Sequence, residues 1–570
     1  MKNIPLYEVR KIRDLKDMLN SSTQIYGEKT AFLYKQKGND KYQSISYVQY
    51  KNDVDSFGTA LISLGLKGKR IALISETRYE WVVSYLSTVN GVGITVPLDK
   101  ELPVEEIKSL LIRSEANAVV FSDNTKDKVF AAIKDLDFVK ILINMDDASS
   151  NEEILSFNDL LKKGQELVSS NDRNFLDAHI DVDEMNMLLF TSGTIDISKA
   201  VMLSHRNICE NLMAMCSMLY ISPNDVALSI LPIHHTYECT CGFLCQTYRG
   251  STVAFCEGLR HIQKNLKESK ATIMLGVPLI FEAMYKRIWD QAAKDPETLK
   301  KLKFGVKISN LLKVFRIDIS KKLFAPLHEN FGGNLRLFIS GAAGIDPIIA
   351  KGFRDLGINI VQGYGLTECA PIVALNRDVD FKDSAAGLPL PGLTVEVVDK
   401  SPEGIGEIRV KGPSVMLGYY ENEEATDSVL KDGWFYTGDL GFIDEDGFVH
   451  LTGRKKNVIV TKNGKNIFPE EIETLLNRSP LVLESMVVGK ESKDAGELIV
   501  HAVIVPNLDN VSAELGNNIT EENVHKLFDN VVKDVNHQLI LYKYIKSFSI
   551  RQTELVKTTT KKVKRYMENI

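Results

Sequence analysis

Short apolar runs alternate with amphipathic segments along most of the first 370 residues. The apolar runs have the length of buried strands, and the segments between them repeat apolar residues at helical spacing. The expected strands are 69–74, 93–98, 118–121, 139–143, 271–275, 335–339 and 358–361, and the expected helices are 47–64, 80–89, 107–112 and 129–136. Strand–helix alternation at this spacing predicts a parallel α/β sheet.

Two early regions depart from this alternation. Residues 1–50 indicate a helix followed by a pair of strands that ends near Tyr47. Residues 145–182 are mostly polar and are interrupted by turn-forming residues, which favours a surface connection.

The pattern of apolar and polar residues changes from about residue 393, where short apolar runs separated by glycine turns predict a β-rich subdomain. A charged stretch at 453–457 then precedes a compact module with a clear amphipathic helix over 524–539. We therefore expect an α/β fold with a large N-terminal domain, residues 1–454, and a small α+β domain, residues 455–570.

Composition narrows the class of protein. The 570 residues are 44% hydrophobic and 25% charged, with a net charge of −6, which is typical of a globular protein and does not favour nucleic-acid binding. The N-terminus has no apolar run of a secretory signal, and no stretch is long and apolar enough for a membrane span. Together with seven cysteines, an odd number, this favours a cytoplasmic protein with reduced thiols and at most peripheral membrane contact.

The stretch from Met187 to His205 carries the first candidate chemistry. An apolar strand leads into a loop rich in hydroxyls and glycine, which ends at a lysine and a second apolar strand. Hydroxyls and backbone N–H groups on a tight turn can hold anions, and the lysine adds a positive charge. The stretch indicates a polyphosphate site without the Walker pattern. The residues concerned are Thr191, Ser192, Gly193, Thr194 and Lys199.

Two later segments add to this candidate site. Gly363, Tyr364, Gly365, Leu366, Thr367 and Glu368 follow a buried strand, where glycine permits close approach of a ligand, tyrosine can stack on a base and glutamate can hold a hard cation. Asp439, after Tyr436, Thr437 and Gly438, has two acceptor oxygens that suit a ribose diol. A strand-ending turn and a structural aspartate turn remain the alternatives for these two segments taken singly.

In combination, these motifs resemble the adenylate-forming superfamily, which includes acyl-CoA synthetases, nonribosomal adenylation domains and luciferases. The resemblance covers nearly the whole chain. The sequence around 453–473 is most similar to that of the fatty acid–CoA ligases. It rests on the following motifs in the family's order: Thr191 to Thr194 with Lys199; Pro232, Ile233, His234, His235; Gly363 to Glu368; Tyr436 to Asp439; Gly453 to Lys456; and, more loosely, Lys557 to Arg565.

The resemblance implies a two-step reaction with ATP, Mg²⁺ and coenzyme A. A carboxylate, most simply a medium- or long-chain fatty acid, attacks ATP to give acyl-AMP and pyrophosphate; a small mobile C-terminal domain then rotates and the CoA thiol displaces AMP. The first step joins two anions, so it requires charge neutralisation and positioning.

The resemblance also assigns roles to residues. The loop with Lys199 would hold the phosphates, Thr367 and Glu368 would position Mg²⁺, and His235 would lie beside the acyl carboxylate. Lys562 would act as the catalytic lysine, although Lys561 stands where the family has glycine and is an alternative, and Lys456 would be the hinge. The remaining nucleotide contacts would come from Gly341, Ala342, Ala343, Gly363, Tyr364, Gly365, Asp439 and Arg454.

The phosphate loop departs from the family at three positions. Ile195 and Asp196 stand where the family has Thr-Gly, and Ala200 replaces glycine. At 4 Å and an effective dielectric constant of 20, Asp196 would repel a phosphate charge by about 4 kcal/mol. A weakened or inactive relative therefore remains an alternative, and so does acyl loading onto a carrier-protein pantetheine. A homodimer is also left open.

His234 and His235, followed by Cys239, Cys241 and Cys245, raise the question of a zinc site. The cysteines do not have the compact Cys-x-x-Cys spacing of such sites, and a cysteine run inside an apolar segment favours buried packing.

Overall fold

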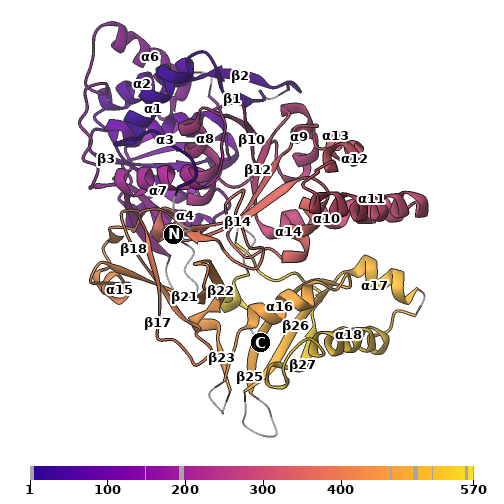
Figure 1. Ribbon diagram of the computed structural model, residues 1–570. Helices are drawn as coiled ribbons and strands as arrows, with labels where there is room; N and C mark the ends of the chain where they lie inside the picture. Colours follow the sequence, from indigo (N-terminus) through magenta and orange to yellow (C-terminus); the bar gives the residue numbers. More distant parts are fainter. Residues whose placement is uncertain are drawn as a thin grey trace. The chain divides into compact units, whose positions relative to one another are not determined.

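The computed structural model describes residues 5–36, 38–147, 149–191, 198–461, 465–491, 498–516, 518–558 and 563–568. These residues form two compact units (Figure 1). The first contains the described residues before 395 together with Lys411–Gly433. The second contains Val395–Val410 and the described residues from Trp434 onward.

A nine-stranded sheet forms one layer of the first unit. Its strands are β1 (Thr30–Tyr34), β2 (Gln43–Ser46), β10 (Val226–Ser229), β11 (Thr252–Phe255), β12 (Ile273–Gly276), β13 (Leu337–Ser340), β14 (Asn359–Gly365), β15 (Ile372–Leu375) and β16 (Leu388–Pro389). They lie in the order β16-β15-β14-β13-β12-β10-β11-β1-β2. The pairs from β14 to β1 are parallel, and β2, β15 and β16 add antiparallel edges.

An eight-stranded sheet forms the other layer. Its strands are β3 (Lys69–Ile74), β4 (Gly93–Pro97), β5 (Ala118–Phe121), β6 (Ile141–Asn144), β7 (Leu155–Ser156), β8 (Met185–Thr191), β9 (Lys199–Ser204) and β19 (Gly418–Tyr419). They lie in the order β19-β9-β8-β4-β3-β5-β6-β7. The strands from β8 to β7 are parallel, as the alternation predicts, whereas β9 and β19 pair antiparallel.

Helices and short helical turns connect these strands in the first unit. Several of these helices begin at capping residues: the Ser46 hydroxyl accepts a hydrogen bond from Gln49 N–H, and Ser204 and Asn207 form a reciprocal capping box. The elements are α1 (Leu15–Tyr26), α2 (Tyr47–Ser63), α3 (Tyr79–Ser87), η1 (Thr88–Val92), α4 (Val104–Ser114), η2 (Asp123–Thr125), α5 (Lys126–Ile133), α6 (Phe157–Ser169), α7 (His205–Met218), η3 (Tyr237–Leu244), α8 (Cys245–Arg249), η4 (Leu259–His261), α9 (Ile262–Ser269), α10 (Pro278–Ala293), α11 (Pro296–Val314), α12 (Ser320–Leu323), α13 (Ala325–Asn330), α14 (Pro347–Asp355), η5 (Thr367–Cys369), α15 (Glu423–Val429) and β20 (Leu430–Lys431).

Each sheet of the first unit has its own buried apolar cluster. One cluster includes Val119 and Phe121 of β5 and Leu188 of β8, packed with residues of α4 and α5. The other includes Met274 of β12 and Phe338 of β13, packed with Phe281 of α10. Central strands such as β5, β11 and β12 are buried along their whole length, which explains why their sequence is almost entirely apolar.

The structure corrects the prediction that 145–182 is only a surface connection, because α6 lies within it. The polar residues of α6 face solvent, while Phe157, Leu160 and Gly164 are buried. The Phe157 ring lies 4.5 Å from that of Phe57 on α2. The sequence does carry the helical repeat, because Phe157, Leu160, Leu161, Leu167 and Val168 recur on one face around Gly164. The prediction was wrong because it weighed the polar residues of 145–182 above that repeat.

The second unit contains a sheet formed largely by β17 (Thr394–Val398), β18 (Gly406–Lys411), β21 (Trp434–Ile443) and β22 (Val449–Arg454). A three-stranded sheet, β25 (Val482–Glu491), β26 (Leu498–Pro506) and β27 (Ile545–Ile550), packs with helices around a separate core. The remaining elements are η6 (Lys455–Asn457), β23 (Ile459–Val460), β24 (Asn466–Ile467), α16 (Pro469–Asn477), α17 (Leu508–Leu515), α18 (Glu521–Asn536), η7 (Leu541–Lys543) and η8 (Arg565–Met567). The β-rich residues thus belong to the same compact unit as the C-terminal module, and a functional boundary at 454/455 stays a prediction.

None of the helices in the described part of the chain is both long and apolar enough to cross a bilayer.

Candidate active site

The two strands that flank the phosphate loop form as the sequence predicts. Thr191 ends β8 and pairs with Lys199, which begins β9. The Thr191 hydroxyl donates to the Lys199 carbonyl over 3.3 Å, so the two ends of the loop are held together. Ser192, Gly193 and Thr194, and the divergent Ile195 and Asp196, lie outside the described residues.

Lys199 and Glu368 are linked through Tyr419. The Lys199 ammonium lies 4.6 Å from the centre of the Tyr419 ring, a cation–π distance. The Tyr419 hydroxyl donates to Oε1 of Glu368 over 2.9 Å. Tyr419 is positioned by β19, which pairs with β9 opposite Val201. The structure therefore brings the candidate phosphate lysine and the candidate metal-binding carboxylate to the same tyrosine.

Oxygen ligands suitable for a hard cation lie at this point of the fold. Thr367 follows β14 in η5, and its hydroxyl lies 3.2 Å from that of Thr236. The hydrogen bond from Tyr419 uses one Glu368 oxygen, and a carboxylate has two. A carboxylate with a neighbouring hydroxyl fits Mg²⁺, which prefers oxygen ligands and shares them with phosphates.

The segment Gly341, Ala342, Ala343 follows the end of β13. A Cβ at Gly341 would come within 2.7 Å of the Tyr237 ring, so this glycine is required by the approach of Tyr237. Ala342 has a φ of 71°, a left-handed conformation that is costly for a residue with a side chain. Such strain is found where a ligand-binding segment is held by its surroundings.

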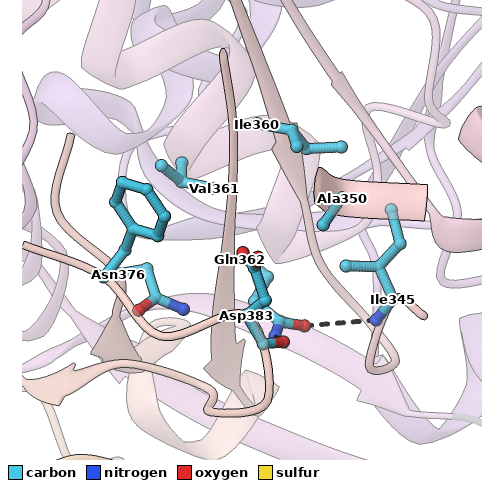
Figure 2. Close-up of a pocket in the computed structure, with 8 residues that line it drawn as sticks. Ile345, Ala350, Ile360, Val361, Gln362, Asn376 and Asp383 are labelled. Carbon is cyan, nitrogen blue, oxygen red and sulfur yellow. Dashed lines mark hydrogen bonds between the residues drawn. The ribbon is translucent and has the colours of Figure 1, made fainter. Parts of the chain in front are cut away.

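A hydrogen-bonded centre fixes this segment against β14 (Figure 2). The Gln362 side chain accepts from Ile345 N–H over 3.1 Å and donates to the carbonyls of Asp383 and Ala385. Ile345 comes just after the Gly341 segment, and Gln362 directly precedes Gly363. The pocket of about 210 Å³ in Figure 2 is therefore a structural junction between two candidate nucleotide-binding segments. Tyr364, in the segment that begins at Gly363, is only 6% exposed.

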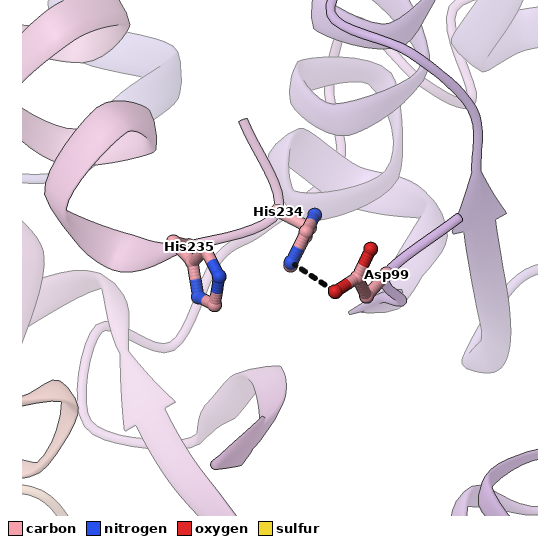
Figure 3. A group of neighbouring side chains, drawn as sticks. All are labelled: Asp99, His234 and His235. Atoms are coloured by element: carbon pink, nitrogen blue, oxygen red, sulfur yellow. Dashed lines mark ion pairs between the residues drawn. The ribbon is translucent and has the colours of Figure 1, made fainter. Parts of the chain in front are cut away.

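The histidine pair lies between β10 and η3, and its neighbour is Asp99, which follows β4. His234 Nε2 lies 3.6 Å from Asp99 Oδ2, and the two histidine rings are 4.1 Å apart (Figure 3). Burial, reinforced by the positive charge of Lys100, lowers the pKa of His234 to about 3. His234 is therefore neutral at pH 7. The cysteines that follow belong to buried η3 and α8, in agreement with the packing interpretation.

Glu238 is a buried acid on η3 that the sequence motifs do not explain. The Ser229 hydroxyl donates to its Oε1, and burial raises its pKa to about 8 despite that hydrogen bond. Glu238 is therefore largely protonated at pH 7, which removes the cost of an unpaired charge in the interior.

An apolar cavity with about 440 Å³ of space, part of it open to solvent, begins at the candidate motifs. Tyr237, Ser340 and Gly363 line it, and each is in or next to a motif segment. The rest of its wall is almost entirely apolar and sulfur-containing: Met215, Cys216, Leu219, Ile221, Cys241, Cys245, Gln246, Ile339, Ile372 and Leu375. Apolar walls with a few polar groups at one end are typical of a small-molecule site.

In the second unit, Asp439 and Arg454 are cross-strand partners on β21 and β22. Arg454 Nε lies 2.9 Å from Asp439 Oδ1, and the Asp439 side chain is mostly buried. Asp439 N–H donates to the Thr437 hydroxyl, which itself donates to the Ile408 carbonyl. The carboxylate is thus held in one orientation, as a ribose-binding group would need.

Lys456 lies in η6, a short 3₁₀ turn that begins directly where β22 ends. Its neighbour Lys455 forms an ion pair with Glu407 over 2.7 Å. Short 3₁₀ turns often connect regular elements, so Lys456 lies in a connector, as a hinge would.

The C-terminal motif, Lys557 to Arg565, is held by ion pairs and hydrogen bonds on both sides of its central lysines. Lys557 forms an ion pair with Glu484 over 2.6 Å and a β-bridge with Val563, and Arg565 donates two hydrogen bonds to Glu473. Lys561 and Lys562 themselves lie outside the described residues.

Three functional features were missed by sequence reasoning. Tyr419 and Asp99 belong to no motif considered, and the walls of the cavity come from segments far apart in the chain. A tyrosine two residues beyond an apolar Met-Leu pair, or a lone aspartate after a strand, carries no local signal of its role.

Comparison with known proteins gives the family. The AMP-binding enzyme family matches residues 19–420, and the AMP-binding enzyme C-terminal domain matches residues 456–567. A long-chain-fatty-acid–CoA ligase of Mycobacterium bovis is 27% identical over 562 residues, covering 94% of this chain and 92% of that protein. Long-chain-fatty-acid–CoA ligase 5 of Rattus norvegicus is 29% identical over 523 residues, covering 84% of this chain and 74% of that protein.

Solved structures agree with this relationship. ATP-bound MatB from Rhodopseudomonas palustris matches with a TM-score of 0.74 and 26% identity, covering 97% of this chain and 98% of that one. The anthranilate CoA ligase AuaEII, in complex with anthranoyl-AMP, has the same fold with a TM-score of 0.78 at 21% identity, covering 99% and 97% of the two chains. The resemblance inferred from the motifs is therefore confirmed, and this chain belongs to the AMP-binding enzyme family of the adenylate-forming superfamily.

Proposed function

We propose that this protein is a fatty acid–CoA ligase that activates a medium- or long-chain acid as acyl-AMP, releases pyrophosphate and transfers the acyl group to the CoA thiol. It is an AMP-forming acid–thiol ligase. The apolar cavity is the observation that supports a fatty acid as its substrate. Relatives named long-chain-fatty-acid–CoA ligases support the same choice.

The cavity lies between the carboxyl ends of β13 and β14 and the residues that follow α7. Ser340 and Gly363 lie at the carboxyl ends of parallel strands β13 and β14, where α/β folds bind ligands. Leu219, Ile221, Ile372 and Leu375 make the wall away from the motifs apolar, which suits a hydrocarbon chain rather than a polar acid.

The residues of the first unit account for the demands of the adenylation step. Lys199, held by the Tyr419 ring, supplies positive charge for the phosphates. Glu368 and Thr367 would hold Mg²⁺, which would screen the repulsion between the carboxylate and ATP. His235 would orient the acid at the mouth of the cavity, and the Gly341 segment with Gly363 and Gly365 would bind the adenosine moiety.

The second unit supplies the remaining proposed roles. Asp439, fixed by Arg454 and Thr437, would bind the ribose hydroxyls. Residues 455–570 would move as a domain about Lys456, with Lys562, or its neighbour Lys561, acting on the carboxylate and α-phosphate.

The proposal is tested by measuring pyrophosphate release from ATP and Mg²⁺ with acids of increasing chain length, with and without CoA. We expect acid-dependent release that is greatest with medium or long chains, and acyl-CoA when CoA is present. No release with any acid would contradict a ligase and support the weakened relative suggested by Asp196.

The acceptor is tested in the same assay. A relative from Arabidopsis thaliana, 27% identical over 568 residues, is named a long-chain-fatty-acid–[acyl-carrier-protein] ligase. Acyl transfer to a pantetheinylated carrier protein but not to CoA would replace the CoA proposal with this alternative.

Filling the cavity should alter chain-length preference. We expect Leu219→Trp to lower turnover of long acids at least ten-fold relative to short ones, because the indole occupies the apolar part of the cavity away from the motifs. The matched control is Tyr220→Trp, at a neighbouring residue that is 45% exposed and does not line the cavity. An unchanged ratio of long-chain to short-chain rates in Leu219→Trp would exclude the cavity as the acyl site.

A further inference from the structure

Three side chains from two segments form a potential ligand set for a metal ion. Asp99 lies in the loop after β4, and His234 and His235 precede η3. One donor atom from each lies within 4.8 Å of the others. Figure 3 shows the Asp99 carboxylate and the His234 ring facing each other, with the His235 ring alongside.

His234 provides a second, independent observation. Its side chain is only 10% exposed, and among the described residues its Nε2 is buried without a hydrogen-bond partner. The nearest acceptor, Asp99 Oδ2, is 3.6 Å away, which is beyond hydrogen-bonding distance. A buried polar nitrogen left without a partner is costly, so its retention requires an explanation.

The spacing fits two ligands of one ion better than a hydrogen bond. With metal–nitrogen and metal–oxygen distances of about 2.1 Å and tetrahedral angles, two ligand atoms are separated by roughly 3.4 Å. The 3.6 Å between His234 Nε2 and Asp99 Oδ2 is close to this value. The His235 ring lies 4.1 Å from that of His234, and one of its nitrogens lies within 4.8 Å of the other two ligand atoms, so it can complete the set.

We propose that Asp99, His234 and His235 bind a divalent transition-metal ion of the Zn²⁺ class, with a coordination position left open. Two imidazoles and one carboxylate are the donors preferred by Zn²⁺ and its neighbours rather than by Mg²⁺, which takes oxygen ligands. The donors of this site therefore differ from the oxygen ligands proposed to hold Mg²⁺ at Glu368. Lys100, the nearest cation in the same loop, forms an ion pair with Glu101, which reduces its repulsion of a metal.

The test is metal titration of the full chain, with thiols reduced and no ATP. Co²⁺ binding is followed by visible d–d absorption and Zn²⁺ binding by calorimetry. We expect one equivalent of metal with nitrogen and oxygen coordination and no thiolate charge-transfer band. His234→Gln and Asp99→Asn should each weaken binding at least ten-fold.

Matched controls carry the same substitutions at exposed positions. His261→Gln and Asp137→Asn should bind metal with wild-type affinity. The two test variants alter different segments, and their folding is checked by thermal unfolding, so either one alone decides the outcome. Equal affinity in wild type and a folded test variant, a thiolate band, or no binding would overturn the site. Because the readout is metal binding, this result is independent of whether the protein activates fatty acids.

Discussion

At the scale of single residues, Tyr419 positions two groups of opposite charge. Its ring faces Lys199, and its hydroxyl donates to Glu368. We predict that Tyr419→Phe retains the cation–π contact and loses the hydrogen bond. A hydrogen bond to a charged group contributes about 1.5–3 kcal/mol, so the adenylation rate should fall roughly ten-fold or more.

The measurement that separates this role from a general structural one is Mg²⁺ dependence. Pyrophosphate release by Tyr419→Phe should need a higher Mg²⁺ concentration for half-maximal rate, because Glu368 is no longer oriented. Tyr420→Phe is the matched control, since that hydroxyl accepts from Arg70 instead. The positioning role fails if the Mg²⁺ dependence is unchanged or if both variants lose the same activity.

At the scale of elements, α6 packs on α2 through an unusually close approach at Gly164. A Cβ at Gly164 would lie 1.9 Å from the Ser56 backbone carbonyl oxygen. Alanine normally favours a helix over glycine by about 1 kcal/mol, but here it must displace a backbone. We predict that Gly164→Ala destabilises the protein by about 2 kcal/mol or more, measured as a fall in the first unfolding transition.

The control for this prediction is Gln165→Ala, at the next and exposed position of α6. It should change stability by less than about 0.5 kcal/mol. Equal effects of the two substitutions would mean that α6 is not held by close packing against α2.

His205, at the start of α7, links three elements through a neutral imidazole. Its Nδ1 accepts from Leu15 N–H over 3.1 Å, and its Nε2–H donates to the Val89 carbonyl over 2.9 Å. Burial lowers its pKa to about 4. The unfolded chain, with a histidine pKa near 6.5, therefore binds a proton that the folded chain does not, and stability is lost as pH falls from about 6.5 to 4.

We predict that the wild type loses about 2 kcal/mol more stability than His205→Gln between pH 7 and pH 5. Glutamine can accept and donate as the neutral imidazole does but cannot be protonated in this range. Denaturant unfolding of both proteins at pH 7, 6 and 5 measures the difference. Parallel pH dependences would refute the linkage.

The elements also show what the sequence pattern can and cannot determine. β3 and β5 have the bounds predicted from their apolar runs, because buried parallel strands are apolar on both faces. Helix α18 was likewise predicted from its apolar face, and its observed bounds differ from the predicted ones by three residues at each end. Helix α6 was missed although Leu160, Leu161, Leu167 and Val168 repeat at helical spacing, because the many polar residues of 145–182 were given more weight than that repeat.

At the scale of the whole molecule, the motifs identified segments but not their partners. Thr191, Lys199 and Glu368 were predicted from local patterns that each carry a chemical signature. Tyr419 was not, because its role depends on β19 pairing with β9 across more than 200 residues of chain. The apolar cavity was not predictable for the same reason, since Leu219, Ile339 and Leu375 converge only in the folded chain.

The proposed two-step reaction makes a last prediction about the chain as a whole. If residues 455–570 rotate about Lys456 between the two steps, restricting the backbone there should affect only the second step. Lys456→Pro fixes φ at the η6 turn. We expect it to spare acyl-AMP formation and to slow thioester formation from supplied acyl-AMP at least ten-fold.

Lys562→Ala should show the reverse pattern, because the proposed role of this lysine is confined to adenylation. Pyrophosphate release would fall at least ten-fold while thioester formation from acyl-AMP continues. Lys561→Ala is the matched control, and a larger loss in it would transfer the role to that lysine. Equal loss of both half-reactions in Lys456→Pro would contradict a hinge, because a substitution that merely disturbs the end of β22 and the neighbouring Asp439–Arg454 pair should impair both steps alike.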